Sequence, residues 1–132
     1  MHMTWSRKHV ITIESMSREE ILTVLDVAAF YRRESRKAKP APYYGTLKGF
    51  TAVNLFFENS TRTRISFELA EKRLGMTTVD FNAPASSLSK GESFEDTLMT
   101  INAMNVDVIV IRHPMNGSAK RATEYVDGSG IS

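Results

Sequence analysis

Apolar residues recur along this chain in alternating helix-like and strand-like patterns. Over residues 18–34 they lie three and four positions apart behind Ser17 and Glu20, a capping-box pair that predicts the start of a helix. Residues 51–57 are apolar at nearly every position, which favours a strand buried on both faces, as in a parallel sheet covered by helices. Residues 106–111 are mostly β-branched and predict another buried strand.

Further helices and one further strand complete the predicted pattern. They are a helix from Arg62 to a stop at Gly75, a strand over 77–81, a helix headed by Ser93 and a last helix over 118–125. Because a strand–helix–strand order predicts a parallel crossover, we expect an α/β domain of three layers, with a parallel β-sheet flanked by helices. The residues expected to face the core from the helix that begins at Arg62 are Ile65, Phe67, Leu69, Ala70 and Leu74.

Composition narrows the class of protein. A chain of 132 residues with 42% hydrophobic content fits one domain, residues 1–132. Its 17 basic and 15 acidic residues leave a net charge of +2, too balanced for general attraction to nucleic acid, so the basic stretch 32–39 is interpreted as a solvated helix end. No apolar run approaches the roughly 20 residues of a membrane span, and we expect no membrane partner and a cytoplasmic location.

Several kinds of chemistry are excluded. The chain has no cysteine, which rules out disulfides, thiolate metal sites and thiol redox chemistry. Its three histidines show no ligand spacing, and we predict no metal and no cofactor. The glycines form neither a dinucleotide fingerprint nor a Walker loop.

A polar turn follows the strand at 51–57 and is the main candidate for function. Ser60, Thr61 and Thr63 offer hydroxyls, and a helix start adds unpaired N–H groups and the positive end of the helix dipole. Arg62 and Arg64 would oppose that dipole unless an anion compensated them, which favours a phosphate or carboxylate site. An ordinary capped helix is the alternative.

Two other candidates lie further along the chain. If the strands at 51–57 and 106–111 are parallel neighbours, their carboxyl ends face one pocket, which would include Arg112. His113 could be a base or a structural residue. Lys90, in the polar loop 82–91, could reach a phosphate or be one more exposed lysine.

Three motifs in this order resemble the transcarbamoylases, in particular the aspartate branch rather than the ornithine branch. They read FENSTRTRISFE at 57–68, SLSKGE at 87–92 and RHP at 112–114. The resemblance implies a carbamoyl-phosphate-binding domain in which Ser60, Thr61, Arg62 and Thr63 hold the phosphate. The residues it implies to be catalytic are Arg62, Thr63, Lys90 and Arg112, and those it implies to bind carbamoyl phosphate also include Ser60, Thr61 and Ser87.

The family also implies a reaction and partners. The amine of L-aspartate attacks carbamoyl phosphate and gives N-carbamoyl-L-aspartate and phosphate, a step of de novo pyrimidine biosynthesis that needs no metal. Ser87 and Lys90 would reach the active site of a neighbouring subunit in a homotrimer, and regulatory or dihydroorotase chains are further partners of such proteins. Arg64 is expected to pair with Glu68, one turn on.

The end of the chain suggests a fragment. The sheet pattern stops near Ser132, where another strand would start, and the family's aspartate-binding domain is not in the sequence. We therefore expect a domain that lacks its last strand region and is inactive alone. The alternatives are an ornithine carbamoyltransferase, or a noncatalytic module that binds an anion or a partner.

Overall fold

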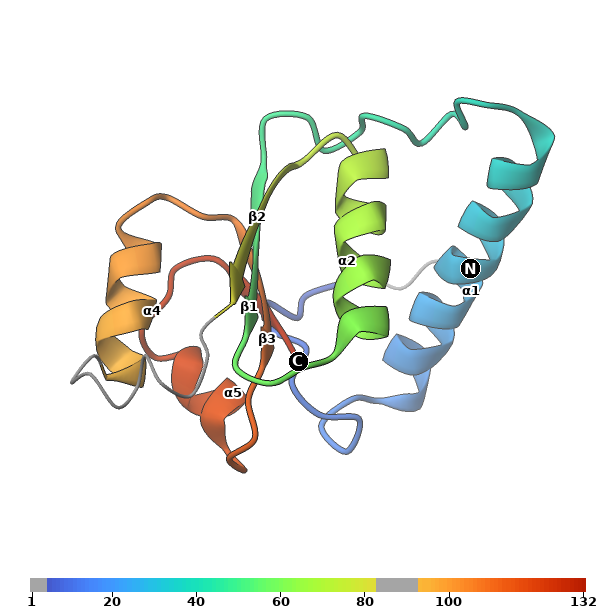
Figure 1. Ribbon diagram of the computed structural model, residues 1–132. Helices are drawn as coiled ribbons and strands as arrows, with labels where there is room; N and C mark the ends of the chain where they lie inside the picture. Colours follow the sequence, from blue (N-terminus) through green and yellow to red (C-terminus); the bar gives the residue numbers. More distant parts are fainter. Residues whose placement is uncertain (1–4, 83–92) are drawn as a thin grey trace.

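Four parallel strands form the centre of the molecule, in the order β2–β1–β3–β4 (Figure 1). The computed structural model describes residues 5–82 and 93–132. Its strands are β1 (Thr51–Phe56), β2 (Thr77–Asn82), β3 (Val108–Arg112) and β4 (Ser129–Ile131). Every pairing between neighbours is parallel, so the predicted parallel sheet is confirmed.

Helices cover both faces of this sheet, which confirms the three layers. The helices are α1 (Arg18–Lys37), α2 (Thr61–Arg73), α4 (Phe94–Asn102) and α5 (Ser118–Ala122). Figure 1 shows α1 and α2 on one side of the sheet, with α4 and α5 on the other. In the described parts of the chain, no helix has the length and apolar character needed to cross a membrane.

The core lies between the sheet and the α4–α5 layer. Leu55 of β1 and Leu98 of α4 are fully buried, and Ile109 and Ile111 of β3 are nearly so. Burying one such side chain contributes about 1.5–3 kcal/mol to folding, so β1 and β3 are held firmly in place. The near-continuous burial of β1 agrees with the unbroken apolar run in its sequence.

The register of β1 and β3 determines what meets at their carboxyl ends. Phe56 lies opposite Arg112, and the Phe57 N–H donates to the Arg112 carbonyl at 2.8 Å. The prediction that the two strand ends face one pocket as parallel neighbours is therefore confirmed.

The prediction for the buried face of α2 is wrong in part. The side chains of Ile65 and Leu69 are 50% and 44% exposed, and Ala70 is also exposed. Phe67 is half-buried, in line with the prediction, and the helix also turns Glu71 inward, where it is buried against the sheet. Helical periodicity identifies an apolar stripe, but it does not show which neighbour covers the stripe.

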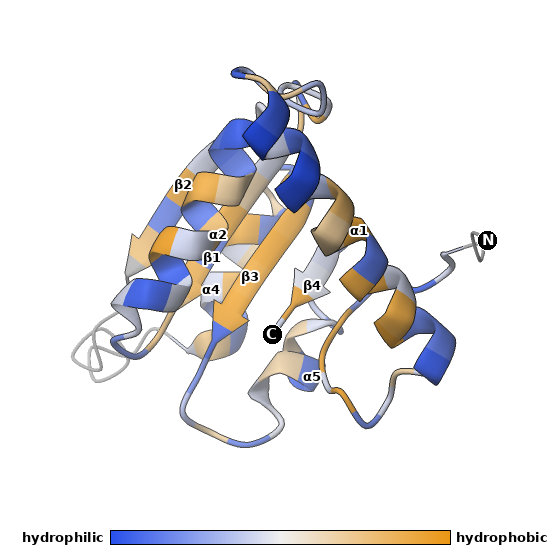
Figure 2. Cartoon of the chain, turned by 90° about the vertical axis from the view of Figure 1, so that its right-hand side faces the viewer, coloured by the Kyte–Doolittle hydropathy of each residue, from blue (hydrophilic) through white to orange (hydrophobic). Residues whose placement is uncertain are grey.

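Helix α1 also has apolar side chains that are exposed to solvent. Leu25 near its middle is 58% exposed, and an apolar stripe is visible along the helix in Figure 2. An ion pair between Arg7 and Glu20 ties its start to the N-terminal segment, and Tyr31 stacks on Tyr43 near its end. Its predicted capping box is confirmed by the reciprocal bonds of Ser17 and Glu20.

Some boundaries differ from those predicted. Helix α1 continues through its basic end to Lys37, and α5 stops at Ala122. The sheet also has a fourth strand, β4, whose outer edge is bridged by Val10 at Ile131. Gly75 ends α2 as predicted, with φ at +84°, and a Cβ there would lie 2.8 Å from the Gly45 Cα.

A buried polar cluster joins β1, α2 and β2. The Asn54 amide donates to Glu71 Oε1 at 2.9 Å and to Asp80 Oδ1 at 3.1 Å. Burial raises the pKa of the Glu71 carboxyl, despite the hydrogen bond from Asn54 that lowers it. The cluster therefore holds a carboxylate whose charged form is disfavoured by the fold.

Replacing Glu71 with Gln should stabilise the protein at neutral pH. A pKa raised above its unfolded value gives stability that is present below about pH 4 and lost as the pH rises through the folded value. Glu71→Gln keeps an acceptor for Asn54 but removes the buried charge. We expect the free energy of unfolding at pH 7.5 to rise by about 1 kcal/mol in urea titrations, and the difference to vanish near pH 4.

Glu68→Gln, one turn earlier on α2, is the matched control. Its hydrogen bond and ion pair with Lys72 lower the pKa of Glu68, so removing this charge should not stabilise the protein at pH 7.5. A Glu71→Gln protein less stable than wild type at pH 7.5 would contradict the assignment of an unfavourable buried charge.

Candidate active site

The start of α2 provides a set of free donors directly after β1. Ser60 is the N-cap residue, and its side chain makes no capping hydrogen bond. The first intrahelical bond runs from the Arg64 N–H to the Ser60 carbonyl at 2.9 Å. The backbone N–H groups before Arg64 therefore point out of the helix end, together with its positive dipole.

Arg112 brings a second positive group to the same place from β3. Its Nε donates to Glu58 Oε1 at 2.7 Å, and its Nη1 lies 3.5 Å from Thr63 Oγ1. Glu58, Thr63, Arg112 and His113 all line a cavity of about 280 Å³ at the carboxyl ends of β1 and β3. The structure thus brings the predicted residues at the start of α2 next to Arg112, which is 49 positions away from Thr63 in the sequence.

The two arginines of the α2 start have different surroundings. Arg62 is exposed, and no carboxylate of the described residues forms an ion pair with it. Arg64 lies 3.7 Å from Glu68, as predicted, and 3.4 Å from Asp80 of β2. Arg62 therefore keeps its charge available for a ligand, whereas Arg64 is engaged with the protein.

The remaining predicted residues divide into two groups. Ser60 is half-buried and Thr61 is exposed, and both belong to the α2 start. Ser87 and Lys90 lie outside the described residues. The described part of the candidate site therefore consists of Ser60 to Thr63 and Arg112.

Glu58 was not among the residues predicted from the sequence. It lies two positions before the N-cap, where its negative charge would repel a bound anion. Its carboxylate forms an ion pair with Arg112, at the end of the neighbouring strand β3. The available clue was an acidic residue directly after one strand and an arginine directly after another. The pairing of Glu58 with Arg112 follows from this pattern only once β1 and β3 are known to be neighbours in the sheet.

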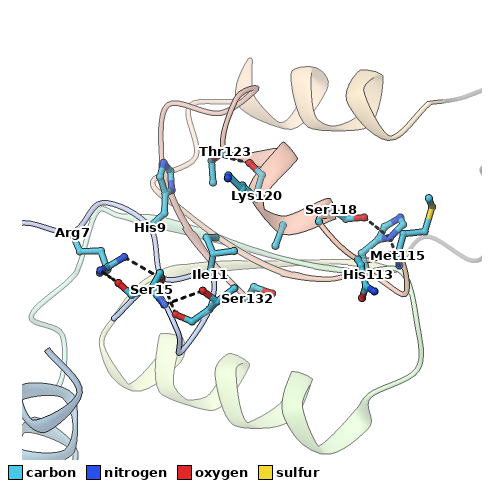
Figure 3. Close-up of a pocket in the computed structure, with 14 residues that line it drawn as sticks. Arg7, His9, Ile11, Ser15, His113, Met115, Ser118, Lys120, Thr123 and Ser132 are labelled. Atoms are coloured by element: carbon cyan, nitrogen blue, oxygen red, sulfur yellow. Dashed lines mark hydrogen bonds between the residues drawn. The ribbon is translucent and has the colours of Figure 1, made fainter. Parts of the chain in front are cut away.

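A larger cavity of about 680 Å³ lies on the other side of the β3 end (Figure 3). It contains none of the residues predicted to bind an anion. Arg7 on its wall is already neutralised, because it pairs with Glu20 at 2.8 Å and lowers the pKa of that carboxyl to about 2. The smaller cavity, with the helix dipole and Arg112, is the better anion site.

The arrangement suits a bound anion. Backbone N–H groups at the start of α2 and the Arg62 guanidinium can hold phosphate oxygens, and the Arg112 guanidinium can add further donors. Within 5–82 and 93–132, no group of three or more His, Asp or Glu residues could hold a metal ion.

Comparison with known proteins identifies the family of this chain. Residues 8–131 match the family described as aspartate/ornithine carbamoyltransferase, carbamoyl-P binding domain. The aspartate carbamoyltransferase catalytic subunit of Thermobifida fusca is 47% identical over 126 residues, covering 95% of this chain and 39% of that protein. The chain thus spans about 40% of the length of this curated relative.

Solved structures agree in fold and sequence. The catalytic subunit of M. jannaschii aspartate transcarbamoylase is 39% identical with a TM-score of 0.82, over 95% of this chain and 41% of that one. Trypanosoma cruzi aspartate transcarbamoylase in complex with carbamoyl phosphate and aspartate is 32% identical with a TM-score of 0.81, over 95% and 38% of the two chains. The chain therefore belongs to the aspartate/ornithine carbamoyltransferase family and carries its carbamoyl-phosphate-binding domain.

Proposed function

We propose that this chain binds carbamoyl phosphate between the start of α2 and Arg112, as part of an aspartate carbamoyltransferase. The observation that carries the proposal is the position of Arg112, whose Nη1 lies 3.5 Å from Thr63 Oγ1 at the helix start. This brings a guanidinium to the place where the free N–H groups and the dipole already favour an anion.

The proposed roles are those that the resemblance to the family implies. Ser60, Thr61, Arg62 and Thr63, with the first N–H groups of α2, hold the phosphate, and Thr63 and Arg112 also polarise the carbonyl oxygen. Ser87 and Lys90 would complete the site from a neighbouring subunit of a homotrimer. Regulatory or dihydroorotase partner chains and a cytoplasmic location stay predictions.

The proposed reaction needs no covalent intermediate with the protein. The lone pair of the L-aspartate amine forms a bond to the carbamoyl carbon, and the C–O bond to phosphate then breaks. The amine proton leaves with the departing phosphate, so the products are N-carbamoyl-L-aspartate and phosphate. Positioned donors stabilise the oxyanion and the leaving group, which is electrostatic catalysis combined with orientation.

Carbamoyl transfer can be tested by joining this chain to the part of the Thermobifida fusca catalytic subunit that it does not match. We expect carbamoyl-aspartate to form when carbamoyl phosphate and L-aspartate are supplied. No product from the chimera, under conditions where the whole T. fusca subunit is active, would contradict the proposed transfer.

Binding to the chain itself can be tested at Arg62. Arg62→Ala removes a charge-assisted donor, which is worth about 1.5–3 kcal/mol, so we expect phosphate affinity to fall tenfold or more in calorimetric titrations. Arg73→Ala, which removes the same charge from the last turn of α2, is the control and should change the affinity less than twofold. Equal affinities for Arg62→Ala and wild type would place the phosphate elsewhere.

Glu58 should oppose the binding of an anion. Its carboxylate occupies the Arg112 Nε–H and adds a negative charge beside the proposed phosphate position. Glu58→Gln should therefore tighten phosphate binding about fivefold, as expected for roughly 1 kcal/mol of repulsion between partly exposed charges. Glu14→Gln makes the same charge change at an exposed position and should have no effect. Weaker binding by Glu58→Gln would mean instead that Glu58 is needed to hold Arg112.

A further inference from the structure

The residue directly after Arg112 belongs to a cluster of three aromatic rings. The His113 ring centroid lies 4.8 Å from that of Phe57 and 4.9 Å from that of Phe94. Phe57 and Phe94 also contact each other edge to face, at 5.3 Å. The imidazole therefore packs against the end of β1 and the start of α4 at once.

Hydrogen bonds define the protonation state of this ring. His113 Nδ1 accepts from the Met115 backbone N–H at 3.1 Å, and the Ser118 hydroxyl lies 2.9 Å from the same atom (Figure 3). A backbone N–H can only donate, so Nδ1 carries a lone pair and the Ser118 hydroxyl also donates to it. The ring is neutral, with its proton on Nε2.

The same contacts fix the backbone that carries Arg112. The Arg112 carbonyl accepts from the Phe57 N–H at 2.8 Å, while the His113 ring packs against the Phe57 side chain. Beyond His113, the bond to Ser118 ties the turn to the start of α5. Arg112 thus leaves β3 from a point that is held on both sides.

We propose that His113 is a positioning residue for Arg112: the neutral ring, packed against Phe57 and Phe94 and accepting hydrogen bonds from Met115 and Ser118 at Nδ1, holds the Arg112 guanidinium over the start of α2. The importance of this for ligand binding rests on the proposed function, whereas the order of the Arg112 side chain does not. Because its Nδ1 lone pair is occupied by two donors, that atom is not available as a general base.

Protonation would remove this anchor. Burial lowers the pKa of His113, and the nearby Glu58 carboxylate opposes the shift. The hydrogen bonds at Nδ1 are therefore present above about pH 6.5 and lost as the pH falls through the lowered folded pKa. The charged and titratable groups that line cavities together with the ring are Glu58, Arg112, Glu95, Arg121, Arg7, His9 and Lys120.

Two substitutions separate the ring packing from the hydrogen bonds. His113→Asn places an amide oxygen near the position of Nδ1 and does not titrate, whereas His113→Phe keeps an aromatic ring but has no acceptor. The first readout is the NMR signal of the Arg112 Nε–H, assigned by its loss in Arg112→Lys. The second is the affinity for inorganic sulfate, whose charge does not change between pH 5 and pH 7.5.

At pH 7.5, we expect His113→Asn to retain the Arg112 Nε–H signal and to bind sulfate with an affinity within twofold of wild type. His113→Phe should lose the signal and bind sulfate at least fivefold more weakly. Wild type should lose sulfate affinity, relative to His113→Asn, as the pH falls through the pKa of His113, which the ring-proton shifts report in the same NMR titration. A merely structural role would not produce this difference in pH profile.

His9 provides a matched control at the opposite end of the larger cavity (Figure 3). Its Nδ1 also accepts a backbone N–H, from Gly130 at 2.9 Å, and burial also lowers its pKa. His9→Phe should leave both readouts unchanged. If His113→Phe does not fold, Ser118→Ala removes one of the two donors and should weaken sulfate binding by more than twofold.

The inference is overturned if His113→Phe keeps the Arg112 signal and the wild-type affinity, or if His113→Asn loses as much as His113→Phe. Identical affinity profiles for wild type and His113→Asn through the measured pKa of His113 would also overturn it. Absence of saturable sulfate binding in wild type would contradict the proposed function instead, and the Arg112 signal would still decide the role of His113.

Discussion

The parallel pairing of β1 with β3 is the constraint on which the rest of the site depends. With Phe56 opposite Arg112, the turn after β1 and the residue at the end of β3 share one edge of the sheet. A shift of one residue would turn the Arg112 side chain to the other face and away from Thr63. The buried apolar side chains of both strands hold this register, so the core and the site are parts of one arrangement.

Positive groups and one carboxylate meet at the carboxyl ends of β1 and β3. The α2 start, Arg62 and Arg112 favour an anion, while Glu58 occupies part of the Arg112 guanidinium. An incoming phosphate therefore meets a site whose donors are already oriented by protein contacts. This preorganisation reduces the ordering cost of binding, although it leaves Glu58 as a competing carboxylate.

Much of this was predictable from the residues. The unbroken apolar runs identified β1 and β3, and the hydroxyls and arginines at 60–64 predicted an anion site at the start of α2, which is a proposal. The strand order, the contact of Glu58 with Arg112 and the exposure of Ile65 required the structure. These features depend on which elements become neighbours, and periodicity along one segment carries no information about that. The sequence allows His113 to be either a base or a structural residue, and its contacts with Met115 and Ser118 distinguish the two.

The position of the anion is the most direct measure of the central claim. A crystal structure of this chain with carbamoyl phosphate should show the phosphate at the first turn of α2, near Arg62, with the carbonyl oxygen within hydrogen-bonding distance of Thr63 Oγ1 and Arg112. An anion bound instead in the larger cavity, beside Arg7 and Lys120, would contradict the account. So would a phosphate that leaves the Arg112 guanidinium without a contact to the ligand.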